Sequence, residues 1–183
     1  MKMKNLIIHP EDGSTVFLKK IYEGLTDKTA VTGGVDKEAI RELILRSDRV
    51  FMLGHGTPSG LISVGKFINA GTYIIDYSMV DALKKQDNNI YIWCDADCFV
   101  RARKLKGFFS GMFISEMAEA LRFDIPDPTE EMIYNSNFEF STLMSKYLDC
   151  DKRTLHANVV REYRKLAESN PVARYNVRRL YVR

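Results

Sequence analysis

Two reactive side chains follow two short apolar runs, which makes them the first residues to consider for chemistry. The run Val50-Phe51-Met52-Leu53 leads into Gly54-His55-Gly56, and the run Ile90-Tyr91-Ile92-Trp93 leads into Cys94. If both runs are neighbouring parallel strands, an imidazole and a thiol emerge side by side at one edge of a sheet. A thiol is a useful nucleophile only as a thiolate, and a nearby histidine can remove its proton. The pair therefore predicts Cys94 as a nucleophile with His55 as its base.

The residues around this pair supply further candidates and one open alternative. Cys98 lies four positions after Cys94 and remains an alternative nucleophile. The backbone N–H of Gly56 is a candidate oxyanion donor, because a glycine lets the backbone approach a substrate closely. Asp95 and Asp97 work against a thiolate, since neighbouring carboxylates raise the pKa of a thiol. They are also candidate substrate-binding residues for a basic side chain.

The elements that must position these side chains alternate along the first half of the chain. Short apolar runs predict strands over 6–8, 29–32, 50–53 and 90–93. Amphipathic segments between them predict helices, with some hairpin decoration after the second glycine of the histidine turn. This order is typical of a mostly parallel sheet flanked by helices on both faces, a three-layer α/β sandwich. Continuous apolar strands are also what a sheet buried on both faces requires.

The second half of the chain is more helical. Asp127-Pro128-Thr129-Glu130 predicts a helix start, with the aspartate as cap, and that helix runs to about Leu148. A further helix is predicted from about 155 to 168. The alternation of apolar and polar residues over 175–182 predicts a late edge strand. With 183 residues and 45% apolar side chains, the chain is most simply one α/β domain over residues 1–183 with a helical C-terminal part.

Composition excludes several classes of function. A formal net charge of +3 is too small to indicate a nucleic-acid partner. No apolar stretch approaches the roughly 18 residues of a membrane span, and the first apolar run ends at Ile8, too early for a secretory signal. We therefore expect a cytoplasmic protein. Three cysteines in such a chain predict no disulfide framework, and Cys94 and Cys98 lack the second pair of ligands of a zinc site, so we expect no metal.

The order of these motifs resembles the caspase-like cysteine peptidases, the clan that includes caspases, gingipains, clostripain, separase and CHAT-type domains. The resemblance covers roughly residues 5–125. It rests on a histidine block, a cysteine block and a glycine-rich loop leading into a helix, over residues 50–56 with 59–61, 90–94 and 107–121. It implies a parallel-sheet α/β sandwich, His55 as base and Cys94 as nucleophile. It also implies cleavage of a peptide or protein substrate without a metal or organic cofactor.

Two other classes of function stay open. The bulky Trp93 directly before Cys94, with the two aspartates after it, would suit a non-catalytic caspase-like module that acts through protein contacts. A flavodoxin-like or Rossmann-like small-molecule binder could use the turn at 57–60, although the histidine turn lacks the third glycine and the acidic partner of a dinucleotide fingerprint. The sequence leaves the oligomeric state open, and a homodimer is one of the alternatives.

Overall fold

A six-stranded sheet forms the centre of the molecule in the computed structural model, which describes residues 3–68 and 70–183. Its strand order is β2-β1-β3-β7-β8-β9, and every neighbouring pair is parallel except β8 and β9. In that order the strands are Lys28–Val31, Asn5–Ile8, Arg49–Leu53, Asn89–Ile92, Gly107–Ser110 and Leu180–Val182. The sheet is thus mostly parallel, as the alternation of elements predicts.

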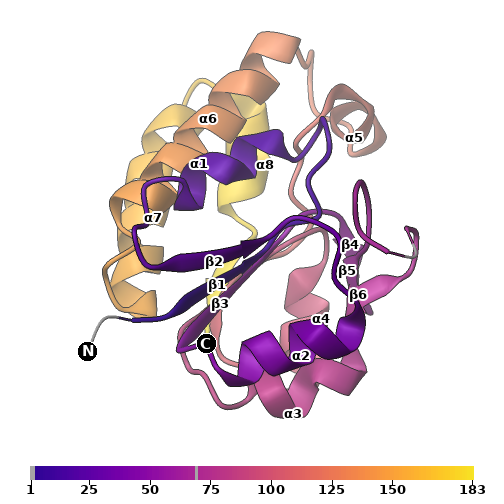
Figure 1. Cartoon of the computed structure of the whole chain (residues 1–183). Helices are drawn as coiled ribbons and strands as arrows, with labels where there is room; N and C mark the ends of the chain where they lie inside the picture. The colour runs from indigo at the N-terminus through magenta and orange to yellow at the C-terminus, as the bar shows by residue number, and fades with distance from the viewer. Residues whose placement is uncertain (1–2, 69) are drawn as a thin grey trace.

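Helices cover both faces of this sheet (Figure 1). One face packs against α2 (Lys37–Leu45), α3 (Val80–Leu83) and α4 (Ala96–Ala102). The other packs against α1 (Lys19–Tyr22), α6 (Glu130–Lys146), α7 (Lys152–Ala167) and α8 (Pro171–Val177). Successive strand residues point to opposite faces, so Phe51 joins one core cluster and Met52 the other. The three-layer α/β class and its helical C-terminal part are therefore confirmed.

Shorter elements decorate this framework. Two 3-10 turns, η1 (Val16–Leu18) and η2 (Tyr77–Met79), lead into α1 and α3, and α5 (Met117–Arg122) follows β8. A separate antiparallel sheet contains β4 (Gly56–Thr57), β5 (Gly60–Ile62) and β6 (Tyr73–Ile75). This small sheet begins directly after His55, so the hairpin decoration grows out of the histidine turn.

Helix α6 begins at Glu130, two residues later than a cap at Asp127 predicts, because a different residue caps it. The hydroxyl of Thr129 accepts a hydrogen bond from the N–H of Met132 at 3.2 Å, while Asp127 lies outside the helix with a φ of 45°. Threonine is a good cap because its oxygen satisfies one of the free N–H groups of the first turn. The predicted capping aspartate is therefore wrong by two positions, although the helix itself is confirmed.

The C-terminal segment differs from the expected edge strand over 175–182. Helix α8 continues to Val177, and only the end of the segment forms strand β9. Asn170 starts this helix, because its side chain accepts from the N–H of Ala173 at 3.0 Å and Pro171 occupies the first turn. These local start signals override the alternation of apolar residues that indicated a strand.

Strand β8 occupies the beginning of the segment 107–121, where the resemblance implied a glycine-rich loop. The strand pairs with β7 on one side and with β9 on the other. Gly107 has a φ of 142°, and a Cβ there would lie 2.0 Å from the carbonyl oxygen of Asn89. The glycine is therefore needed for the close approach of two strands, and it does not mark a loop.

Candidate active site

The carboxyl ends of β3 and β7 bring His55 and Cys94 to one place. The two strands pair in parallel with Leu53 opposite Ile92, and the N–H of Gly54 donates to the carbonyl of Ile92 at 3.0 Å. His55 and Cys94 follow at this edge, and both line one small cavity of about 20 Å³. A cavity of that size holds about one water molecule. His55 and Cys94 are therefore neighbours around a single cavity at the edge of the sheet.

The His55 ring is held by the loop that follows β1. Its Nε2 atom lies 2.8 Å from Oδ2 of Asp12 and 2.9 Å from Oγ of Ser14. The other carboxylate oxygen of Asp12 accepts from the backbone N–H groups and the hydroxyls of Ser14 and Thr15, at 3.0 to 3.1 Å. Partial burial acts to raise the pKa of Asp12, but these hydrogen bonds and the neighbouring His55 ring together lower it. Asp12 is therefore an ionised acceptor for the imidazole.

This contact defines which ring nitrogen of His55 is free to act as a base. An ionised carboxylate can only accept, so Nε2 of His55 carries the hydrogen that Asp12 receives. In the neutral ring the lone pair is then on Nδ1, and no hydrogen bond among the described residues involves that atom. A base that is oriented by a third group is the usual arrangement for activating a nucleophile.

Asp12 was not predicted as a site residue, although the sequence does predict the turn that contains it. The segment Asp12-Gly13-Ser14 has the composition of a turn, and that turn follows β1. Because β1 is parallel to β3, with Ile8 opposite Met52, both strands end at the same edge of the sheet. A carboxylate in the turn after β1 is therefore near the residue after β3, but only the strand order reveals this.

The Cys94 thiol has two oxygen neighbours. Its sulfur lies 3.9 Å from the carbonyl oxygen of Phe113 and 3.8 Å from Oε1 of Glu119, and either oxygen can accept from the S–H group. Burial, followed by the negative charge of Glu119, raises the pKa of Cys94 to about 12. Asp95 contributes in the same direction, as its position next to the thiol predicts. Cys94 is consequently a protonated thiol at neutral pH in this conformation.

Ser115, four positions earlier in the chain, holds the Glu119 carboxylate in place. Its second oxygen accepts from the backbone N–H of Ser115 at 2.7 Å and from the Ser115 hydroxyl at 3.2 Å. Ser115 and Phe113 also line the cavity that contains Cys94 and His55. The segment 113–119 therefore covers the thiol with two acceptors and one charge. Glu119 was missed because it comes 25 residues after Cys94 in the chain.

The other predicted residues on the cysteine side lie next to this cavity and outside its lining. Cys98 is exposed on α4, and burial and the charge of Asp97 raise the pKa of its thiol. Asp97 lies 4.0 Å from the guanidinium of Arg101. Asp95 has a left-handed φ of 64° directly before α4, and burial and the charge of Asp97 raise the pKa of its carboxyl. The structure thus brings Cys94, and not Cys98, to His55.

Gly56 is explained by packing against an indole. A Cβ at this position would lie 2.1 Å from Cδ1 of Trp93, and the Trp93 indole N–H donates to the carbonyl of Thr57 at 3.1 Å. Gly56 belongs to β4 and is outside the lining of the cavity. The indole therefore accounts for this glycine, and the oxyanion role of its N–H stays a prediction.

Comparison with models of known protein families, with curated proteins and with solved structures found no match. Among the described residues, no group of three or more His, Cys, Asp or Glu side chains is arranged to hold a metal ion. No helix in the described part of the chain is long and apolar enough to cross a membrane.

Proposed function

We propose that this chain is a cysteine-dependent hydrolase that cleaves peptide bonds, with Cys94 as nucleophile and His55 as base. The observation that supports it is that His55 and Cys94 both line one cavity at the ends of β3 and β7. Asp12 is the positioning residue in this proposal, since its carboxylate holds the Nε2 side of the ring. The caspase-like resemblance implies the same two roles for His55 and Cys94.

The chemistry follows from these positions. His55 Nδ1 takes the proton of the Cys94 thiol, and the thiolate forms a C–S bond to the carbonyl carbon of a peptide. The imidazolium then protonates the amine as the C–N bond breaks, which releases one product and leaves a thioester. Water, deprotonated by His55, attacks this thioester, and the thiol regains its proton as the acid product leaves. The N–H of Gly56 is the proposed donor to the oxyanion in both steps.

The conformation described above is a resting state of the proposed hydrolase. A thiol whose pKa is about 12 supplies very little thiolate at neutral pH. A cavity of about 20 Å³ also leaves no room for a peptide beside Cys94. Cleavage therefore requires a rearrangement that enlarges the cavity and moves the Glu119 charge away from the sulfur.

The same two observations favour a second candidate function. A buried, protonated thiol under a closed segment also suits a non-catalytic module that binds a protein or a small molecule. The two candidates differ in whether any peptide bond is ever cleaved by this chain. A cytoplasmic location, supported by three free cysteines, and a homodimer are compatible with either one.

Incubation with a mixed-sequence peptide library separates the two candidates. New peptide termini are read by mass spectrometry for the wild-type chain and for Cys94→Ala, His55→Ala and Cys98→Ala. The hydrolase proposal expects new termini from the wild type and from Cys98→Ala, the matched control, and none from the other two variants. Absence of new termini from the wild type, or cleavage that survives Cys94→Ala, would favour the binding module.

A further inference from the structure

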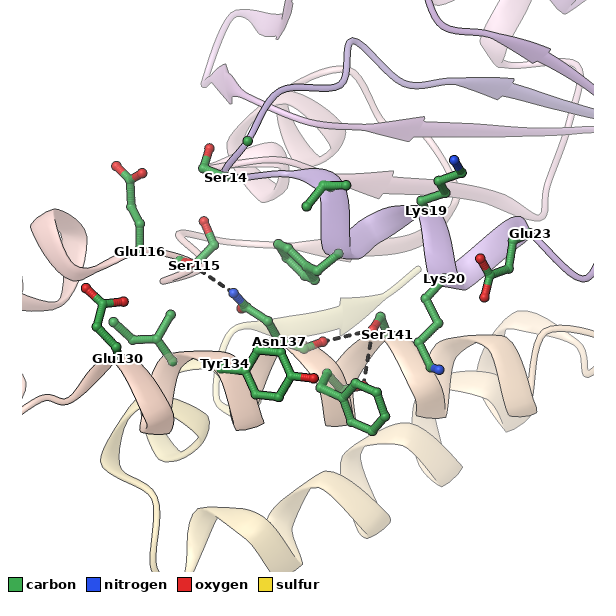
Figure 2. A pocket seen from close by; sticks show the side chains of 15 residues that line it. Ser14, Lys19, Lys20, Glu23, Ser115, Glu116, Glu130, Tyr134, Asn137 and Ser141 are labelled. Atoms are coloured by element: carbon green, nitrogen blue, oxygen red, sulfur yellow. Dashed lines mark hydrogen bonds between the residues drawn. The ribbon is translucent and has the colours of Figure 1, made fainter.

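A groove opens next to the cavity, between the segment η1–α1 and helix α6. Its volume is about 660 Å³, which falls within the range of sites that hold small ligands or peptide segments. Phe17 and Ser115 line both the groove and the cavity of His55 and Cys94. Ser14 lines the groove as well, and its hydroxyl is 2.9 Å from Nε2 of His55. We name this hollow the Tyr134 groove, after the aromatic residue on its α6 wall (Figure 2).

The wall formed by α6 presents exposed aromatic rings. Tyr134 is 64% exposed and Phe138 is 45% exposed, and their rings stack with centroids 6.0 Å apart. On the opposite wall, Val16 is 50% exposed. Large apolar side chains scattered singly on a surface are ordinary, but several around one hollow mark a binding surface. The middle of the Tyr134 groove therefore suits an apolar side chain of a ligand.

The two ends of the Tyr134 groove differ in charge. Glu116 and Glu130 lie at the end nearest the cavity, whereas Lys19, Lys20 and Glu23 lie at the opposite end (Figure 2). None of these five side chains forms an ion pair with another described residue. The Lys20 ammonium lies 4.6 Å from the centroid of the Phe138 ring across the groove. The other charges are available to a ligand that is basic at the cavity end and acidic, or neutral, at the far end.

A buried acceptor in the groove also lacks a donor. Asn137 is only 8% exposed, and its amide N–H donates to the carbonyl of Ser115 at 2.9 Å (Figure 2). Its Oδ1 atom has no hydrogen-bond partner among the described residues. Buried polar atoms are nearly always paired, but this oxygen is itself closed to solvent, so a ligand N–H reaches it only after neighbouring side chains shift.

We propose that the Tyr134 groove binds an extended peptide segment with a basic residue toward Glu116 and Glu130, an apolar residue against Tyr134, and an acidic residue toward Lys19 and Lys20. The assignment rests on the proposed function, because it directs the basic part of the peptide to the cavity of His55 and Cys94. A peptide fits better than a compact metabolite, since the charges lie at opposite ends of an elongated apolar surface.

Binding is measured on the full chain carrying Cys94→Ala, so that no cleavage competes. The probe is a short fluorescein-labelled peptide with arginine near one end, leucine in the middle and aspartate near the other end. Fluorescence anisotropy at low salt should show saturable binding, and peptides with two arginines or two aspartates in place of the mixed pair should bind about threefold to tenfold more weakly. Added salt should reduce the difference, because exposed charges are screened.

Two pairs of variants connect this binding to the groove. Tyr134→Ala and Glu130→Lys should each weaken binding of the mixed peptide about fivefold or more. Tyr77→Ala and Glu131→Lys are the matched controls, because Tyr77 is 76% exposed outside the groove and Glu131 neighbours Glu130 without lining it. The controls should bind as the parent does. All four changes are at exposed positions, so a folded chain is expected in each case.

The outcomes distinguish this proposal from the proposed function. Saturable, Tyr134-dependent binding to Cys94→Ala, together with no peptide cleavage by the wild-type chain, would support the groove and reject the hydrolase. Cleavage at an unchanged rate in Tyr134→Ala and Glu130→Lys would support the hydrolase and overturn the groove. A failure of every labelled peptide to bind would also overturn it. So would a dimer of the chain that Tyr134→Ala dissociates, because a second copy would then be the occupant.

Discussion

Asp12 Oδ2 lies 2.8 Å from Nε2 of His55, so a turn after the first strand positions the imidazole that follows the third. This contact joins two segments through the side-by-side pairing of β1 and β3. It directs Nδ1 of the ring away from Asp12 and leaves that atom available as a base. The pair is therefore the natural place to test whether the imidazole does chemistry.

Replacing Asp12 by asparagine should reduce kcat about 100-fold, the lower range of what a positioned base contributes. The amide can still contact the ring, but it no longer compels the hydrogen to stay on Nε2. KM should remain unchanged, because Asp12 lines neither the cavity nor the Tyr134 groove. Steady-state kinetics on a peptide substrate give both constants. Glu11→Gln is the matched control, and equal kcat in Asp12→Asn and wild type would contradict the orienting role.

Replacing Glu119 by glutamine should make the Cys94 thiol more reactive. The negative charge of Glu119 is the largest cause of the raised thiol pKa after burial. Glutamine keeps an oxygen that can accept from Ser115 but removes the charge, so the pKa should fall while burial still holds it above the ordinary value. The rate of alkylation of Cys94 by iodoacetamide, followed by mass spectrometry across alkaline pH, measures this change.

Glu116→Gln is the matched control for the thiol experiment. Glu116 is exposed three positions earlier and makes no contact with the Cys94 sulfur. Its alkylation profile should coincide with that of the wild type. An unchanged profile for Glu119→Gln as well would show that the carboxylate does not govern the thiol.

How much of this site the sequence could predict depends on how local each signal is. The strand ends at His55 and Cys94 were predictable, because continuous apolar runs identify buried parallel strands wherever they occur. The contacts of Asp12 and Glu119 were not, since each depends on which strands and loops lie side by side. Strand β8 was missed for a related reason: Gly107 satisfies a close approach to Asn89 that is visible only once β7 and β8 are paired.

Stability should fall as the pH decreases below neutrality because of His9. This residue is fully buried, its Nδ1 is 2.9 Å from the Tyr22 hydroxyl, and burial lowers its pKa from 6.5 to about 4. Between those two values the unfolded chain binds a proton that the folded chain does not. The free energy of unfolding should therefore decrease by about 3 kcal/mol as the pH falls through this window. Urea denaturation at several pH values measures the slope.

His9→Gln separates this effect from that of the carboxylates. The variant has no group at position 9 that titrates in the window, so its pH slope should be smaller than that of the wild type, whatever its absolute stability. The comparison uses slopes alone, because the substitution also changes the contact with Tyr22. Parallel curves for the two proteins would show that His9 does not titrate on unfolding.

Gly56→Ala should destabilise the fold by about 1–3 kcal/mol, the usual cost of overpacking. The added Cβ would lie 2.1 Å from Cδ1 of Trp93 and 2.6 Å from the carbonyl oxygen of Gly60. Thermal and urea unfolding measure the loss. Gly24→Ala is the control, because a Cβ there meets nothing within 4 Å. Equal stability of the two variants would mean that the indole can move away from the hairpin.

Trp93 also determines which part of the molecule is able to move. Its indole donates to the Thr57 carbonyl at 3.1 Å and packs edge-on against Phe99, with ring centroids 5.5 Å apart. The Trp93 side chain therefore joins the loop that carries His55 to the loop that carries Cys94. Exposure of the sulfur is therefore easier to achieve by displacing the carboxylate of Glu119 than by separating the loops that carry His55 and Cys94.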